Sequence, residues 1–268
     1  MKKLFLGGTH FFPHEANRMK KEGDVSTARE LFIKDRKNNL DFLLRKRFNW
    51  MNEYIKSTKD IIEIGAGAGF SKFYIKKNYI LSDVLDNPWI DLKIDALKMD
   101  IKDASIDAII TSHSIHHFSK PSLFFKECER VLRPNGIILI QEINTSLMMR
   151  FLLKTMRHEG WSYDVDVYDE TKIANDPEDP WSANCAIPEL LFQDEDLFHE
   201  KFKSLKIILN TKVEGFILPL SGGVISKINI PELPYWVLNI VSILDKFLIC
   251  IAPQIFSMGR SIVIKKQN

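Results

Sequence analysis

Between residues 58 and 142, short apolar runs alternate several times with segments in which apolar residues recur at helical spacing. Mainly apolar runs at 61–64, 79–81, 106–110 and 137–140 have the length of strands that are buried on both faces. Segments with helical spacing separate these runs. The alternation predicts an α/β fold with a mostly parallel sheet, right-handed crossovers and helices on both faces.

Helical spacing also extends before and after this region. Apolar side chains recur near helical spacing over residues 24–56, which predicts a helix with Ser26 or Thr27 as its cap. Shorter helices are predicted at 69–77, 121–133 and 146–158.

The crossover between Asp83 and Asp95 is too short for a normal helix. Only 11 residues lie between these two acids, and 86–89 (Asp-Asn-Pro-Trp) breaks helical structure. Parallel strands normally need a dozen or more connecting residues. We therefore expect the second crossover helix to be missing or reduced to a turn.

The C-terminal part contains strand material and one strongly apolar helix. Residues 206–209 and 213–218 predict two strands around a turn, and 261–264 a final strand. Residues 234–253 predict a helix with few polar side chains. It would pack against the domain or against a second subunit as a homodimer, or else its stretch 235–252 would contact a membrane surface.

Composition narrows the class of protein. The chain has 268 residues, 45% hydrophobic and 27% charged, which is ordinary for a globular protein, and its net charge of +2 gives no bulk attraction to nucleic acid. Three scattered cysteines, Cys128, Cys185 and Cys250, match no zinc pattern. No run of 18 apolar residues and no secretory signal are found, so we expect a cytoplasmic protein in a reducing compartment.

A glycine-rich turn follows the first strand directly. Gly65, Gly67 and Gly69 are spaced two apart, so the third glycine comes one place too early for a dinucleotide fingerprint. Glu63 precedes the turn, and Asp83 follows the next apolar run, where nucleotide-binding folds place an acid for ribose hydroxyls. The turn lets the backbone approach a ligand closely.

Together, these residues resemble the cofactor signature of class I S-adenosylmethionine-dependent methyltransferases, in particular the type 11-like domain. Asp95-Ala96, Ser112-His113, the Ile115–Phe118 element and the turn 130–136 continue the resemblance in order over residues 58–142. It implies a Rossmann-like sheet of seven strands with an antiparallel last strand. It also implies S-adenosyl-L-methionine as cofactor, with Trp89 or Ile90 in the adenine wall.

The resemblance implies one set of cofactor-binding residues. They are Glu63, Gly65, Ala66, Gly67, Gly69, Asp83, Val84, Asp95, Ala96, Ser112 and His113. In the glycine turn, the ligand bonds would come from backbone N–H groups.

Four segments are expected. They are an N-terminal helical cap at 1–57, the cofactor-binding core at 58–145, an inserted lid or substrate segment at 146–204, and sheet-edge strands with the apolar helix at 205–268. The inserted segment is acidic and long, and such loops are usually lids or binding elements.

The candidate general bases are Glu142, His113 and His117, because each follows a strand whose end faces the ligand side of the sheet. His158 would act only if the insert folds over the site, and we expect at most one of His116 and His117 to point into the pocket. Asp164, Asp166 and Asp169 lack the glycine and the closing glutamate of a calcium loop, so no metal is expected.

The predicted function is methyl transfer to an oxygen or nitrogen of a small or carrier-linked acceptor. Ser221-Gly222-Gly223 and the late apolar helix resemble methyltransferases encoded among bacterial surface-glycan enzymes, which favours a sugar acceptor. The sequence lacks the motif typical of methyltransferases that modify amino groups of DNA bases, so we do not expect nucleic acid as a substrate or partner. The alternatives are a non-catalytic module that binds the cofactor, and a nicotinamide-dependent oxidoreductase.

Overall fold

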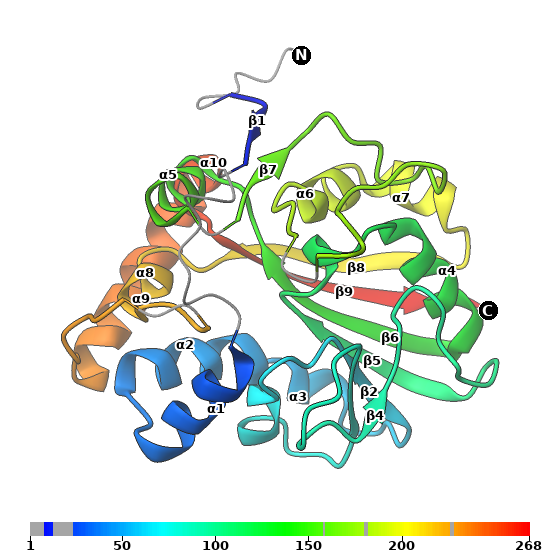
Figure 1. Ribbon diagram of the computed structural model, residues 1–268, viewed down its shortest axis with the longest axis horizontal. Helices are drawn as coiled ribbons and strands as arrows, with labels where there is room; N and C mark the ends of the chain where they lie inside the picture. Colours follow the sequence, from blue (N-terminus) through cyan, green and yellow to red (C-terminus); the bar gives the residue numbers. More distant parts are fainter. Residues whose placement is uncertain (1–7, 13–23, 158, 180–181, 226–227) are drawn as a thin grey trace.

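The structure is a computed structural model and describes residues 8–12, 24–157, 159–179, 182–225 and 228–268. Seven strands form one sheet in the order β4-β3-β2-β5-β6-β9-β8 (Figure 1). Strands β4 to β6 in that order pair parallel, and β9 pairs antiparallel with both β6 and β8. The predicted fold class, including the antiparallel last strand, is confirmed. The strands are β2 (Ile61–Ile64), β3 (Ile80–Asp83), β4 (Leu92–Lys93), β5 (Ile106–Ser112), β6 (Leu132–Ile143), β8 (Leu205–Val213) and β9 (Gly259–Lys266).

Alternate residues of the central strands enter two different hydrophobic cores. Ile109 of β5 and Ile138 of β6 belong to the core on one face, while their neighbours Ala108 and Leu139 belong to the core on the other. Both faces are therefore buried, which explains the nearly continuous apolar runs in the sequence. The first face is covered by α4 (Pro121–Val131), α6 (Ile187–Phe192) and α7 (Glu195–Lys201), and the second by α1 (Val25–Lys34), α2 (Asn38–Phe48) and α3 (Met51–Tyr54).

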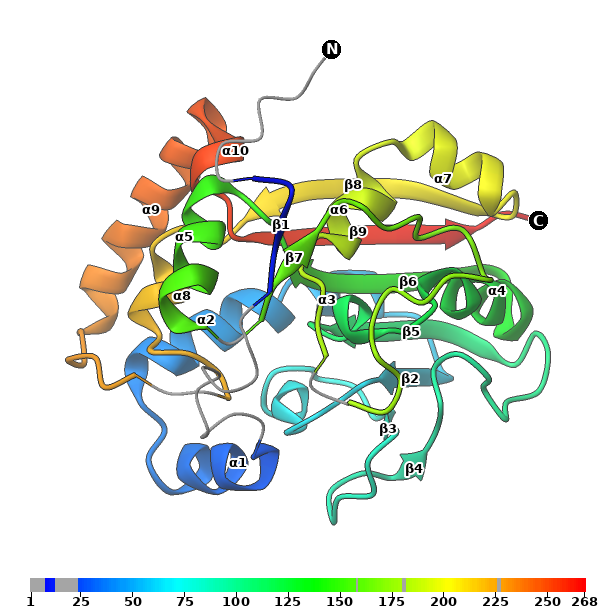
Figure 2. The ribbon, with the colours of Figure 1, turned by 45° about the horizontal axis from the view of Figure 1, so that its top comes forward.

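The remaining elements lie mainly beyond the carboxyl ends of the parallel strands (Figure 2). There α5 (Leu147–Met156), α8 (Ile217–Leu220), α9 (Tyr235–Ile251) and α10 (Pro253–Phe256) gather beside a small antiparallel ribbon. The ribbon joins β1 (His10–Phe11) to β7 (Trp161–Ser162).

Two predicted helices differ from the observed ones. The helix expected at 24–56 is three helices, α1 to α3, with a first break at Asp35–Lys37, and its cap is Asp24, whose carboxylate accepts from the Thr27 N–H at 3.0 Å. The helix expected at 69–77 is a single 3₁₀ segment, η2 (Phe70–Phe73). The expected absence of a second crossover helix is confirmed, because a turn without helix joins β3 to β4.

The predicted strand at 206–209 is confirmed, but the prediction of a second strand at 213–218 was wrong. The first segment lies within β8, which ends at Val213, and the second segment leads into the short helix α8. Phe216 and Ile217 donate their N–H groups to the carboxylate of Asp245 in α9, at 2.7 and 3.1 Å. These backbone N–H groups have the Asp245 carboxylate as acceptor in place of the carbonyl groups of a neighbouring strand. The segment can therefore leave the sheet without losing its hydrogen bonds.

Helix α9 turns polar residues inward and apolar residues outward. Asp245 and Ser242 are buried, while Ile243 and Phe247 are 66% and 62% exposed. Packing against the domain therefore accounts for one side of the helix only. Among the residues that the structure describes, no helix combines the length and apolar character needed to cross a bilayer.

A buried ion pair joins the N-terminal helices to the far end of the sheet. Arg47 of α2 donates to both carboxylate oxygens of Glu214 at 2.9 and 2.8 Å, and the side chain of each is 5% exposed. Gln141 of β6 donates to the same carboxylate at 2.8 Å. Gly259 leaves room for the Glu214 side chain, because a Cβ at position 259 would lie 2.9 Å from the Glu214 carboxyl carbon.

We expect Arg47→Ala to lower the free energy of unfolding by about 3–5 kcal/mol, because it leaves the Glu214 carboxylate buried without its cation. Urea denaturation followed by circular dichroism measures this change. Lys56→Ala is the control, since Lys56 and its partner Glu53 are both exposed. A loss below about 1 kcal/mol for Arg47→Ala would show that the pair contributes no more than a surface pair.

Candidate active site

A cavity of about 700 Å³ opens at the carboxyl ends of β2, β3, β5 and β6. Each of the four predicted segments contributes to its wall: α1 and α2, the core strands, α5 with the insert, and the region around α8. In open α/β sheets, ligands bind at this edge. The lining residues outside the core include Val25, Leu44, Arg47, Phe48, Met149, Met156, Glu159, Asp176, Pro177, Asp179, Leu218, Gly223, Val224 and Ile225.

The three glycines of the turn have positive φ but serve different purposes. A Cβ on Gly65 would lie 2.4 Å from the Ser114 hydroxyl, so this glycine allows close packing of two turns. A Cβ on Gly67 would meet no atom within 4 Å, because its backbone faces the cavity. Gly69 does not line the cavity; it begins η2 against Trp89 and Arg29.

The N–H groups of the turn are largely used within the protein. Ala66 donates to the Ser82 carbonyl at 3.0 Å, and Gly69 donates to the Ala66 carbonyl at 2.8 Å. Gly67 donates to the Asp83 carboxylate at 2.8 Å. These three N–H groups therefore have acceptors within the protein, and the turn provides shape to the cavity.

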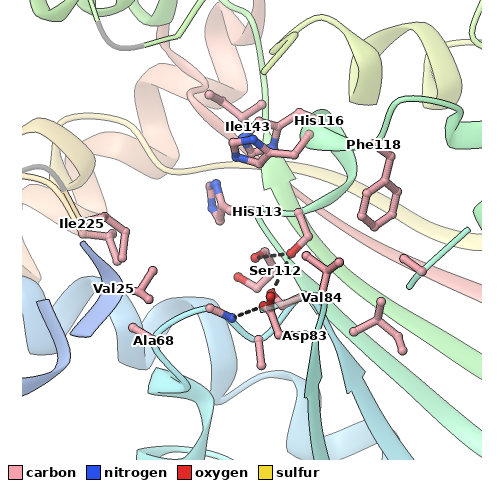
Figure 3. Close-up of a pocket in the computed structure, with 18 of the residues that line it drawn as sticks. Val25, Ala68, Asp83, Val84, Ser112, His113, His116, Phe118, Ile143 and Ile225 are labelled. Atoms are coloured by element: carbon pink, nitrogen blue, oxygen red, sulfur yellow. Dashed lines mark hydrogen bonds between the residues drawn. The ribbon is translucent and has the colours of Figure 1, made fainter. Parts of the chain in front are cut away.

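Asp83 lies at the end of β3 with its carboxylate fixed by two backbone donors (Figure 3). Gly67 N–H donates to one oxygen, and Leu85 N–H donates to the other at 2.9 Å. Each carboxylate oxygen can accept further hydrogen bonds, such as those from ribose hydroxyls. Val84, which is 55% exposed, lines the cavity beside it.

Trp89 and Ile90 do not line the cavity, so their predicted place in an adenine wall was wrong. The Trp89 indole N–H donates to the Gly67 carbonyl at 2.8 Å, and the Arg29 guanidinium lies over the ring at 5.0 Å. Arg29 also donates to the Ala68 carbonyl at 2.7 Å. This arrangement supports the glycine turn from behind, and the cavity beside Asp83 is lined by Val84, Leu85, Ile94, Asp95, Ala96 and Leu97.

Asp95, Ala96 and Ser112 all line the cavity, as predicted from the sequence pattern. One oxygen of the Asp95 carboxylate accepts from the Leu97 N–H at 2.8 Å, which fixes the side chain at the surface of the cavity. Ser112 ends β5 beside them. These three residues and Asp83 therefore share one side of the cavity.

Glu63 is almost fully buried, at 1% exposure, at the inner end of the cavity. Its carboxylate accepts a hydrogen bond from the Ser71 hydroxyl, which in turn accepts from the Tyr79 hydroxyl at 2.8 Å. Burial raises the pKa of Glu63 to about 8, although the bond from Ser71 acts in the opposite direction. Glu63 is thus protonated over most of the neutral range.

His113 lies in the cavity wall directly after β5 (Figure 3). Its φ of +53° turns the chain, and its backbone N–H donates to the Gln141 carbonyl at 2.8 Å. Within the described residues, its Nε2 is buried and has no hydrogen-bond partner. Burial, and then the charge of Arg47, hold the pKa of His113 well below its usual range.

Glu142 does not have the freedom of a general base. Its fully buried carboxylate accepts from the N–H groups of Ser114, Ile115 and Ile143, at 2.8, 2.6 and 3.0 Å. It also pairs with Nδ1 of His116 at 2.7 Å. Burial opposes ionisation, but the charge of His116 and its hydrogen bond hold the pKa of Glu142 at about 2. The predicted base is therefore a residue that positions its neighbours.

His116 and His117 both line the cavity, whereas at most one was expected to point into it. Both belong to η3 (Ile115–His117). Nδ1 of His117 is 3.1 Å from the Ser182 carbonyl oxygen. Burial and the charge of His116 lower the pKa of His117 to about 4; despite burial, Glu142 raises the pKa of His116 to about 10. His158 lies outside the described residues.

Sequence analysis missed several wall residues. One carboxylate oxygen of Glu159 is 3.7 Å from Nε2 of His116 and the other is 3.8 Å from Nε2 of His117, and Arg47 reaches the cavity from α2. Acidic and basic residues are common in both segments, so composition could not single these out. They can be recognised only in the folded structure, because the cavity brings together residues that are 42 or more positions apart in the sequence.

Comparisons with known proteins agree with this geometry. Residues 62–140 match the sequence model of a family described as a methyltransferase domain. No curated protein matches the chain. The structure is similar to that of an S-adenosylmethionine-dependent methyltransferase from Archaeoglobus fulgidus, with 18% identity, 88% of this chain and 98% of that chain covered, and a TM-score of 0.51.

A second similar chain comes from a complex that contains the Haloferax volcanii Trm112 methyltransferase activator. It is 12% identical, the match covers 92% of this chain and 96% of that chain, and the TM-score is 0.47. The match of residues 62–140 to a methyltransferase domain confirms the predicted resemblance over this part of the chain.

The shape and the polar groups of the cavity fit S-adenosylmethionine. Gly67 leaves open space where a side chain would intrude, and Asp83 presents a fixed carboxylate beside it. A volume of about 700 Å³ is within the range of cavities that hold small ligands.

Glu63 gives the protein a stability that depends on pH. Because its pKa is raised on folding, its contribution is complete below the unfolded value near 4.5 and is lost as the pH rises through about 8. Between pH 5 and 8, we expect the free energy of unfolding of the wild type to fall relative to Glu63→Gln, by at most about 1.4 kcal/mol per pH unit.

Urea titrations at pH 5, 6, 7, 8 and 9 would test this expectation. Glu53→Gln is the matched control, because Glu53 is an exposed glutamate. Parallel pH profiles for the wild type and Glu63→Gln would contradict the assigned protonation of Glu63.

Proposed function

We propose that this protein transfers a methyl group from S-adenosylmethionine to an oxygen or nitrogen atom of a small or carrier-linked acceptor. The observation that carries the proposal is the juxtaposition of Gly67 and Asp83 on one wall of the cavity. The match of residues 62–140 to a methyltransferase domain supports the same reaction class.

Different residues of the core would contact different parts of the cofactor. Asp83 would accept hydrogen bonds from the ribose hydroxyls, and Asp95 with Ala96 would face the adenine. Gly65 and Gly67 would give the backbone its close approach, while Glu63 lies behind the turn. The cofactor supplies a methyl group that is already activated by the positive charge of its sulfur.

The protein must then orient the acceptor and exclude water. We propose that residues 146–204 form the lid, since Met149, Met156 and Asp179 line the cavity opposite the core. His113 is the proposed base for a hydroxyl acceptor, because its Nε2 has no partner among the described residues. Glu142 positions the turn that carries it.

A sugar hydroxyl or amine is the proposed acceptor. Glu159, Asp176 and Asp179 line the cavity and can accept hydrogen bonds from such groups. Trp161 does not contribute a stacking surface, because it is fully buried against Phe11. The three cysteines form no disulfide, in keeping with a cytoplasmic setting.

Calorimetric titration with S-adenosylmethionine and S-adenosylhomocysteine tests the cofactor site. We expect Asp83→Asn to weaken both ligands about 10- to 100-fold, because it removes the charge from two charge-assisted hydrogen bonds. Asp86→Asn, three residues further on at an exposed position, should bind as the wild type does. Unchanged affinity in Asp83→Asn, or no binding by the wild type, would overturn the proposal.

His113→Asn belongs in the same titration, because asparagine tolerates the positive φ at this position. Wild-type affinity in this variant would place the imidazole on the acceptor side, as proposed. A loss of affinity would instead make His113 a cofactor residue.

We further propose that the outer face of α9 lies on a membrane surface that carries the acceptor. Trp236, Ile240, Ile243, Phe247 and Ile251 follow one another every three or four residues and are all at least half exposed. Such a stripe is typical of helices that lie in the membrane interface.

The charges around this face favour anionic lipid over a second subunit. The single acid of α9, Asp245, is buried, and Lys246 is exposed. Lys46 of α2 lies close enough to Lys246 for their charges to interact, so the helix and its neighbour present positive charge. The inner residue Leu238 belongs to the same hydrophobic cluster as Leu218 of the cavity wall, so a lipid-linked acceptor would enter close to the site.

Co-sedimentation with vesicles of phosphatidylcholine and phosphatidylglycerol tests this surface. We expect the wild type to bind and the double variant Ile243→Glu, Phe247→Glu to lose most of that binding, because two charges would enter the interface. Ile173→Glu, at an exposed apolar position of the insert, is the matched control. A wild-type dimer in light scattering that the double variant dissociates, without vesicle binding, would overturn the membrane proposal.

A further inference from the structure

Three potential metal ligands converge on the cavity from two distant parts of the chain. Nε2 of His116 is 3.7 Å from one carboxylate oxygen of Glu159, and Nε2 of His117 is 3.8 Å from the other. Their ligand atoms all lie within 4.8 Å of one another. All three residues line the cavity, so this group faces the same space as the proposed methyl transfer.

Both imidazoles are oriented by a partner on the opposite ring nitrogen. Nδ1 of His116 is 2.7 Å from the Glu142 carboxylate, and Nδ1 of His117 is 3.1 Å from the Ser182 carbonyl. A carbonyl oxygen can only accept, so Nδ1 of His117 carries the proton and its Nε2 keeps a lone pair. Histidines that ligate metals almost always donate their other N–H to a carboxylate or a backbone carbonyl. The His116 ring beside Glu142 would release its Nε2 proton when the metal ion binds.

The backbone beside Glu159 is also fixed. Gly160 pairs with Asn184 in a β-bridge, and its carbonyl accepts from the Cys185 N–H at 2.9 Å. A Cβ on Gly160 would lie 2.3 Å from the Phe11 carbonyl oxygen, so the chain passes through a narrow space at this point. The carboxylate is therefore delivered to the histidines by a defined part of the fold.

We propose that His116, His117 and Glu159 bind a divalent first-row transition metal ion through the two Nε2 atoms and the carboxylate. Two imidazoles and one carboxylate are a donor set for zinc, iron, cobalt or nickel, whereas magnesium and calcium prefer oxygen ligands alone. The remaining coordination positions would open into the cavity.

Metal binding requires the three ligand atoms to move closer together. Ligand atoms bound at 2.0–2.1 Å in a tetrahedral site are about 3.3 Å apart. The two carboxylate–imidazole distances, which involve different carboxylate oxygens, exceed this by about half an ångström, and no two of the ligand atoms are more than 4.8 Å apart. Rotation about the side-chain bonds of Glu159, together with an adjustment of the histidine rings, would bring the three ligand atoms to bonding distance.

The site deepens the proposed function, on which this step rests. A metal ion in this position would bind an oxygen donor of the acceptor and lower the pKa of a hydroxyl group. It would favour acceptors that carry a hydroxyl or carboxylate oxygen over simple amines.

Titration of the EDTA-treated full chain with Co²⁺, followed by visible absorption, and with Zn²⁺, followed by calorimetry, tests the proposal. We expect one ion per chain, and affinity at least about tenfold weaker in Glu159→Gln and in His117→Asn, since each loses one ligand. His199→Asn is the matched control, because its Nδ1 also contacts a backbone carbonyl, that of Leu205, but it lies outside the cluster.

S-adenosylhomocysteine titration of the same samples separates this proposal from the function it rests on, and also shows that each variant is folded. Cofactor binding without stoichiometric Co²⁺ or Zn²⁺ binding would overturn the metal site and leave the function standing. So would metal binding that neither variant weakens. Metal binding without cofactor binding would support the site and overturn the function.

Discussion

The buried carboxylate of Glu142 accepts from the backbone N–H groups of Ser114 and Ile115 and pairs with the His116 ring, all from the segment that follows β5. An irregular turn buried at the edge of a sheet would otherwise leave these donors without partners, at a cost of about 1–3 kcal/mol each. One side chain at the end of β6 therefore allows the chain to turn into the cavity after β5. His113, His116 and His117 reach their places because that turn is held.

The glycine turn after β2 is held in a comparable way, by Asp83 on the cavity side and by Trp89 and Arg29 behind it. Gly67 N–H donates to Asp83, Trp89 donates to the Gly67 carbonyl, and Arg29 donates to the Ala68 carbonyl. A turn with these bonds already made is preorganised, so little conformational entropy is lost when a ligand arrives. The bond from Gly67 N–H, together with the bond from Leu85 N–H, explains the fixed orientation of the Asp83 carboxylate.

Patterns that depend on local composition could be predicted from the sequence, and patterns that depend on distant partners could not. The runs at β2, β5 and β6 had to be strands, since both faces of the sheet are covered, and the short segment after Asp83 left no room for a helix. The places of Gly67, Asp83 and Ser112 followed from their positions at strand ends. By contrast, Glu142 looked like a free acid, Trp89 like a ligand wall, and residues 213–218 like a strand. Each was decided by a partner that only the folded chain supplies: His116 and three N–H groups, the Gly67 carbonyl, and the Asp245 carboxylate.

The family match ends at residue 140, yet about two fifths of the residues that line the cavity lie outside it. The core supplies the side of the cavity with Asp83 and Asp95, while α2, α5, the insert and the region before α9 supply the opposite side. The buried pair between Arg47 and Glu214 joins two of these outer segments to each other, and Gln141 joins them to the sheet. Helix α2 and the region before α9 are thus fixed to the sheet through charged groups in the interior, which tolerate little displacement because an unpaired buried charge is costly. Under the proposed function, selectivity for the acceptor would arise from the identity of the outer wall residues, including Glu159 and Asp179.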